Sequence, residues 1–128
     1  FLNDALIAQA AILLFDQVPR NAFRGTPEAF ATDPLATELA HGFIARRWHR
    51  CLPKDQRAFA GMPLMHSERI ADQRASLVYF RLIPSNFAFA RDHWRMIARF
   101  GRFPHRNAVL GRRSSAAECA AVAAGNAW

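Results

Sequence analysis

The sequence is poor in lysine and cysteine and lacks a long hydrophobic run. Lys54 is the only lysine among 17 cationic residues in the 128-residue chain. The two cysteines, Cys51 and Cys119, match neither a metal-binding nor a redox-pair spacing, so we expect reduced thiols and a cytoplasmic protein. The longest apolar stretch, ALIAQAAILLF, is interrupted by Gln9 and stops at Asp16, short of the roughly 18 residues that a membrane span needs. We therefore expect no membrane association and no metal or other cofactor.

The composition is that of a globular protein, with 52% hydrophobic and 21% charged residues. We expect a single helical domain over residues 1–128. Because the sequence opens at Phe1 and not at methionine, we also expect an amino-terminal segment of that domain to be missing. The formal charge is +7, and an arginine-rich surface is one way to bind a polyanion, although a solvated charged face explains such a composition as well.

Apolar spacing and proline positions predict helices along the first half of the chain. Apolar residues recur every three or four positions near the start and predict a helix that is capped by Asn3 and ended by Pro19. Thr32, followed by aspartate and proline, predicts the start of a longer helix. Between Pro53 and Pro63 we expect about two helical turns at most.

The second half is also predicted to be helical. A run of helix-forming residues follows Leu64, Ser85–Asn86 is expected to cap the next helix, and Ser115 and Glu118 have capping-box spacing. No stretch shows the two-residue alternation of a strand. We therefore predict an all-α fold of several short antiparallel helices in a tetratricopeptide-like superhelical stack.

One phrase occurs twice: VPRNAFRG, from Val18 to Gly25, and FPHRNAVLG, from Phe103 to Gly111. Each copy places proline, arginine, asparagine and glycine after a helix, which is the chemistry of a helix exit. We predict two related corners whose arginines, Arg20 and Arg106, pair with carboxylates of neighbouring helices. Asp16 in the first corner is a predicted partner of Arg102 in the second.

MHSERIADQ, from Met65 to Gln73, is the densest polar cluster. On one helix His66 and Glu68 would point about 200° apart, which argues against a shared metal ion. Glu68 and Asp72 would share a face and would need arginine partners. An enzyme that uses His66 or His105 with Glu68 as acid–base groups stays an alternative, although no nucleophile elbow or phosphate-binding loop is present.

Three long motifs resemble a bacterial family of uncharacterised proteins, the domain of unknown function 924. They are ILLFDQVPRNAFRGTPEAFATDPLA, PLMHSERIADQ and IARFGRFPHRNAVLGRRSSAAE, and the resemblance covers Leu6 to about Glu118. It implies an all-helical, tetratricopeptide-like domain with an aromatic-rich amino-terminal segment that this sequence lacks, and it implies no activity. The family motifs supply the candidate binding residues: Asp16, Gln17, Arg20, Asn21, Arg24, His66, Glu68, Asp72, Gln73, Arg102, His105, Arg106 and Asn107.

The sequence favours an interaction module for a protein, a peptide or a small acidic ligand. Nucleic-acid binding through the arginines between Arg91 and Arg113 is the least favoured alternative. A homodimer is left open.

Overall fold

A computed structural model describes residues 3–128, and within them the chain forms six α-helices, three short 3₁₀ helices and no strand. The predicted all-α class is confirmed. The elements are α1 (Ala5–Ala22), η1 (Pro27–Phe30), α2 (Asp33–Ala45), η2 (Trp48–Cys51), α3 (Lys54–His66), α4 (Ile70–Phe80), α5 (Pro84–Phe100), η3 (Pro104–Arg106) and α6 (Ala116–Ala123).

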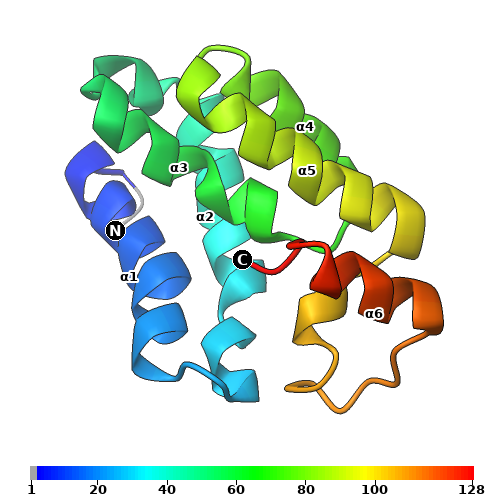
Figure 1. The fold of residues 1–128 in the computed structure, drawn as a ribbon. Coiled ribbons are helices and arrows are strands. Elements are labelled where there is room, and N and C mark those ends of the chain that lie inside the picture. Colours follow the sequence, from blue (N-terminus) through cyan, green and yellow to red (C-terminus); the bar gives the residue numbers. More distant parts are fainter. Residues whose placement is uncertain (1–2) are drawn as a thin grey trace.

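Each helix from α1 to α5 packs against the next one along the chain, and α3 also contacts α1 and α5 (Figure 1). α6 and the segment around η3 lie beside the carboxyl end of α5 (Figure 1). The tetratricopeptide-like form of this stack stays a prediction. None of the helices over residues 3–128 has the length and hydrophobicity that crossing a membrane requires.

The core consists of three apolar clusters that follow the helix order. Ile12 and Phe43 lie in the cluster of α1, α2 and α3, Phe80 lies between α3, α4 and α5, and Ile97 and Phe103 join α5 to α6. These side chains are at most 3% exposed. The same packing brings the polar ends of α1, α2 and α3 and the η3 segment together.

Pro19 does not end the first helix, as the sequence predicted, but lies buried inside α1. A proline at this position leaves the carbonyl of Phe15 without its usual amide donor. The hydroxyl of Thr32 donates a 2.7 Å hydrogen bond to this carbonyl from the segment before α2. A side chain from outside the helix therefore replaces the lost bond, and the helix continues to Ala22.

Pro63 also lies inside a helix, so the expected two-turn helix is a 13-residue one, α3. The chain breaks instead at Ser67, where the backbone becomes extended before α4. Gln73 supports this break, because its side-chain amide donates to the carbonyls of Met65 and Ser67 at 2.6 and 2.7 Å. Glu68 consequently lies in the break and not on a helix face with Asp72.

Thr32 stands at the N-cap position of α2, as the sequence predicted, but two other predicted caps are wrong. Asp4, and not Asn3, caps α1 by accepting the amides of Leu6 and Ile7. α5 begins at Pro84, one residue before the expected Ser85–Asn86 cap. The capping box of α6 is confirmed: Ser115 and Glu118 exchange side-chain and backbone hydrogen bonds.

The repeated phrase does not form two equivalent corners. Pro19 lies within a helix, whereas Pro104 begins the 3₁₀ turn η3 after a separate exit at Gly101. Only the ends of the two copies agree, since Gly25 and Gly111 both have positive φ, at 81° and 66°. The helix that the proline was expected to end is held by a distant hydroxyl, which the local sequence does not encode.

Candidate functional site

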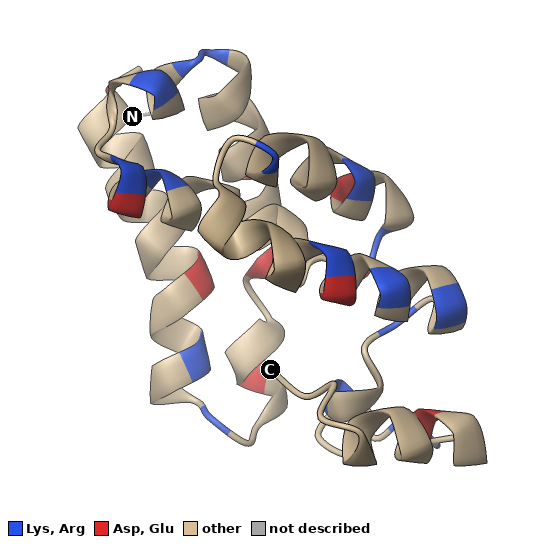
Figure 2. Ribbon diagram, turned by 45° about the horizontal axis from the view of Figure 1, so that its top comes forward, with Lys and Arg blue, Asp and Glu red and all other residues tan. Residues whose placement is uncertain are grey.

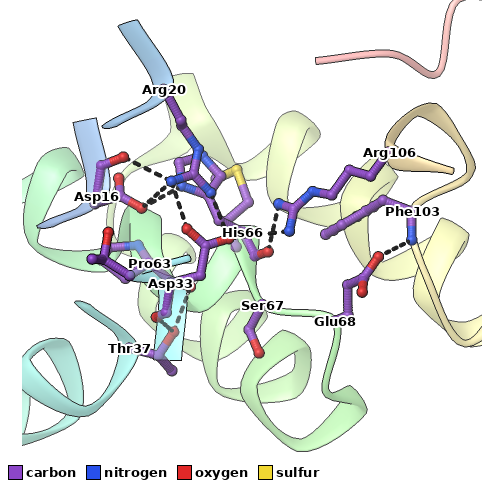
Figure 3. A network of polar contacts seen from close by, with 12 residues as sticks. Asp16, Arg20, Asp33, Thr37, Pro63, His66, Ser67, Glu68, Phe103 and Arg106 are labelled. Carbon is purple, nitrogen blue, oxygen red and sulfur yellow. Dashed lines mark hydrogen bonds and ion pairs between the residues drawn. The ribbon is translucent and has the colours of Figure 1, made fainter. Parts of the chain in front are cut away.

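Asp33, at the start of α2, is the point where two distant arginines meet. Arg20 of α1 makes a two-point contact with its carboxylate, at 2.8 and 2.9 Å. Arg106 of η3 donates to the same carboxylate at 3.1 Å (Figure 3). The predicted clamping of carboxylates by Arg20 and Arg106 is confirmed, and the two arginines share one carboxylate.

The contacts close into a ring. Arg20 also lies 3.2 Å from a carboxylate oxygen of Asp16, and that oxygen is 2.7 Å from Nδ1 of His66 (Figure 3). Arg106 donates a 2.8 Å hydrogen bond to the backbone carbonyl of His66. We call this set, Asp16, Arg20, Asp33, His66 and Arg106, the ion-pair ring. It joins α1, α2, α3 and η3.

Asp16 is the more deeply buried of the two anions in the ring, with 1% of its surface exposed. Burial by itself would raise the pKa of this carboxyl, but the hydrogen bond from His66 and the nearby charges of His66 and Arg20 outweigh it, so the pKa is lowered. An ionised Asp16 accepts the proton on Nδ1 of His66, which leaves Nε2 as the second functional atom of the imidazole. No hydrogen bond to Nε2 occurs among residues 3–128.

Arg106 is held between two aromatic rings. Its guanidinium carbon lies 4.4 Å from the centre of Phe30 and 4.8 Å from that of Phe103, and its side chain is 7% exposed. Burial lowers the pKa of this guanidinium and the carboxylate of Asp33 opposes the change, but an arginine stays charged at neutral pH. Arg106 is therefore a fixed cation with little freedom to move.

A pocket of about 690 Å³ opens beside the ring. Its apolar wall is formed by Pro27, Phe30, Pro34 and Leu110. The other lining residues are mostly polar: Asp33, Thr37, Glu38, His41, His66, Ser67, Glu68, Arg69, Asp72 and Arg106. Ring members thus face a space that is large enough for a small ligand or part of a peptide.

Asp72 lies at another part of this pocket. Its two carboxylate oxygens accept hydrogen bonds from Nε2 of His41 at 2.8 Å and from the hydroxyl of Ser67 at 2.7 Å. The carboxylate therefore stands between the serine and the histidine. A nucleophilic triad needs the histidine in contact with the serine, so this arrangement does not activate Ser67.

Glu68 makes no hydrogen bond with His66 or His105 among residues 3–128, so the alternative acid–base group lacks a direct contact between its members. Arg112 pairs with Glu68 at 2.8 and 2.9 Å, and the backbone amide of Phe103 donates to it at 2.7 Å. Burial would raise the pKa of Glu68, but these bonds and the charges of Arg112 and Arg106 lower it. Glu68 is an ionised brace at the pocket wall.

The predicted pair of Asp16 and Arg102 is also wrong. Arg102 pairs with Glu118 of α6 at 2.8 Å, and Asp16 belongs to the ion-pair ring. The hydrogen bond from Arg102 and that from the backbone of Ser115 hold the pKa of Glu118 at about 2. Arg102 therefore anchors α6.

The structure separates the remaining predicted site residues from the pocket. Gln17 contacts Asp16, Gln73 is buried under the α3–α4 break, and Asn21 and Arg24 are exposed. Asn107 is buried against Ser114 and Arg112, and His105 lies in an aromatic cluster with Phe103. The candidate residues that line the pocket are His66, Glu68, Asp72 and Arg106.

Sequence reasoning missed Asp33, His41 and Arg112. In the sequence, Asp33 indicated only the start of a helix. His41 was expected on the polar face of that helix, where no neighbouring residue indicated a partner for it. Their partners are 13 to 73 residues away, so only the packing of the helices reveals them. Among residues 3–128 no group of three His, Cys, Asp or Glu side chains has the geometry of a metal site.

The fold has a counterpart among solved structures. A solved structure of a protein of unknown function from Agrobacterium tumefaciens, ATU0120, is 38% identical and superposes with a TM-score of 0.92, over 97% of this chain and 71% of that one. No curated protein matches. Residues 3–126 match the family described as "Bacterial protein of unknown function (DUF924)". The chain therefore belongs to the DUF924 family.

Proposed function

We propose that this protein is a binding module whose pocket takes a short peptide or a peptide-like zwitterion. The observation that carries the proposal is the open pocket that is lined both by His66, which Asp16 fixes through Nδ1, and by an apolar wall. A wall of proline, phenylalanine and leucine suits an apolar side chain, and the polar lining suits the hydrogen-bonding groups of a main chain.

The charge balance of the pocket favours a zwitterion over a purely acidic ligand. Both Arg20 and Arg106 are already paired with Asp33, and Glu68 is paired with Arg112. An anion would have to compete with Asp33 for Arg20 and Arg106, and the more accessible cation of the lining is the exposed Arg69. A ligand with one positive and one negative group can bind both the ion-pair ring and the exposed carboxylate of Glu38. No buried charge is then left unpaired.

A tripeptide library with free termini and one apolar side chain tests the proposal by thermal shift. Binding to the native state raises the melting temperature, and succinate serves as the purely acidic comparison. We expect tripeptides to bind and Glu38→Gln to weaken binding, while Asp55→Asn, an exposed acid outside this pocket, leaves binding unchanged. Stabilisation by succinate and not by any tripeptide would replace the proposal with an acidic-ligand site.

A second candidate function is acid–base catalysis on the bound ligand. The pairing of Asp16 with His66 favours it, because a buried carboxylate that fixes Nδ1 prepares Nε2 to accept or donate a proton. Mass spectrometry of incubated tripeptides separates the two candidates. Turnover that disappears in His66→Gln while binding persists indicates an enzyme, and unchanged peptides in the wild type indicate a binding module.

The exposed arginines of α5 give nucleic-acid binding less support. Arg91, Arg95 and Arg99 are exposed, and positive positions recur along α5 (Figure 2). Asp92 lies within 3.5 Å of Arg91 and 3.3 Å of Arg95. Arg102, Arg106 and Arg112 are committed to carboxylates, and the other cations are spread over many elements (Figure 2).

A further inference from the structure

A second site lies where the chain after α6 folds back across the molecule. Gly125 adopts a φ of 98°, and both the backbone and side-chain nitrogens of Asn126 donate to the carbonyl of Ala121, at 3.2 and 2.9 Å. The chain then runs from α6 toward the centre of the molecule (Figure 1). This turn delivers the indole of Trp128 onto three side chains, His93, Phe103 and His105, which we call the aromatic cradle.

The cradle has one flat floor and two walls. The indole stacks on the ring of His93 with centroids 3.9 Å apart and planes 24° apart. It meets Phe103 and His105 edge-on, at 6.3 Å and 78° and at 5.9 Å and 87°. Face-to-face contact on one side and edges on two others is a geometry that selects planar aromatic rings.

The cradle is uncharged at neutral pH. Nδ1 of His93 donates to the carbonyl of Phe89 at 2.7 Å. Burial lowers the pKa of His93 to about 3 and that of His105 to about 4, so both imidazoles are neutral. A neutral heteroaromatic ring therefore fits the cradle better than a charged one.

One polar atom of the cradle lacks a partner. Nδ1 of His105 is buried and makes no hydrogen bond among residues 3–128. A buried polar nitrogen without a partner is unfavourable, and the edge-on indole of Trp128 does not relieve it. Trp128 stacks in the cradle but makes no hydrogen bond to Nδ1 of His105, and the residue remains 43% exposed.

We propose that the aromatic cradle of His93, Phe103 and His105 is a binding site for a neutral planar heteroaromatic ring with a ring nitrogen, and that Trp128 is its intramolecular occupant. The ligand displaces the half-exposed indole and adds the hydrogen bond to His105. None of the three cradle residues lines the peptide pocket, so this inference is independent of the proposed function.

Indole binding to the Trp128→Gly variant tests the proposal. We expect the ring resonances of His93 and His105 to shift in NMR spectra, and the melting temperature to rise by about 3 °C at saturating indole. The wild type should bind at least about tenfold more weakly, because its own indole occupies the cradle most of the time. Benzofuran, which keeps the ring shape without the N–H group, should bind less tightly than indole.

Two controls make the test specific. Trp128→Gly combined with His93→Ala removes the floor and should abolish the shifts, whereas Trp48→Gly empties a different aromatic contact, with Phe43, and should leave His93 unaffected. Absence of indole-dependent shifts in Trp128→Gly, or equal shifts without His93, would overturn the proposal. Should that variant fail to fold, the native protein decides: the indole N–H resonance of Trp128 must move as added indole displaces it, and an unmoved resonance counts against the site.

Discussion

Asp33 is the residue on which the ion-pair ring depends, because its single carboxylate receives two guanidinium groups. Arg20 lies 13 residues and Arg106 73 residues away from it in the sequence. A carboxylate shared in this way couples the two arginines energetically, since the loss of one leaves the other with the whole carboxylate.

We predict that Arg106→Ala lowers the free energy of unfolding by about 1 to 3 kcal/mol, because the buried Asp33 and the carbonyl of His66 lose a donor. Arg20→Ala should have an effect of similar size. Urea denaturation measures both. In the double variant the effects should not add, and additive effects would show that Asp33 does not couple the two arginines.

The sequence predicted part of the ion-pair ring. Arginine next to asparagine in both copies of the repeated phrase pointed to clamped carboxylates, and Arg20 and Arg106 do clamp one. The shared partner was not predictable, because Asp33 is 13 residues from Arg20 and 73 from Arg106, and only helix packing brings the three side chains together. Asp16 was matched with Arg102 on charge alone, and the fold gives Arg102 to Glu118 instead.

At the scale of elements, helix boundaries were the least predictable feature. Local chemistry predicted the α6 cap correctly, because both partners of a capping box lie within one turn. It failed at Pro19 and Pro63, which lie inside α1 and α3. The hydroxyl that replaces the bond lost at Pro19 comes from Thr32, and nothing in the sequence around Pro19 indicates it.

We predict that Thr32→Val destabilises the protein by about 1 kcal/mol, because the carbonyl of Phe15 loses its only side-chain donor among residues 3–128. Thr32→Ser keeps the hydroxyl and serves as the matched control. Thermal unfolding followed by circular dichroism compares the two variants. Equal melting temperatures for valine and serine would mean that α1 tolerates Pro19 without this bond.

Alanine substitutions at two helical glycines test how closely the helices pack. A Cβ atom at Gly61 in α3 would overlap the ring of Tyr79 in α4, whereas one at Gly42 in α2 would meet only the flexible end of Arg46, at 3.2 Å. We predict that Gly61→Ala destabilises by about 1 to 3 kcal/mol through overpacking. Gly42→Ala should stabilise by about 0.5 to 1 kcal/mol, as alanine does in helices. Chemical denaturation of both variants checks the opposite signs.

At the scale of the whole molecule, charge is organised by pairing across elements and not by a single surface patch. The formal charge of +7 suggested a polyanion surface. Partly buried arginines pair with carboxylates and so join α1 to α2, the α3–α4 break to the η3 segment, and the end of α5 to α6. The all-α class followed from apolar periodicity, but this use of charge followed only from the three-dimensional packing.

Histidines whose pKa values are lowered in the folded chain, above all His93 and His105, make the stability of the whole molecule depend on pH. The folded pKa values of His93 and His105 are about 3 and about 4, against 6.5 for an unperturbed histidine. Between about pH 4 and 6.5 the unfolded chain therefore binds protons that the folded chain does not, so the free energy of unfolding falls as the pH is lowered through this window. The lowered pKa values of Asp16 and Glu68 act in the same direction, but mainly below about pH 4.5.

Urea titrations at about pH 5, 6 and 7 should show this loss, with a limiting slope of about 1.4 kcal/mol per pH unit for each histidine once its unfolded form is fully protonated. His105→Gln removes one of the titrating groups, so we expect the slope to decrease. A stability that does not change between pH 7 and 5 in the wild type would require the cradle to admit a protonated imidazole. A neutral ligand ring would then bind the cradle no better than a charged one. The pH profile and the indole titration therefore test, by independent measurements, whether the cradle prefers neutral rings.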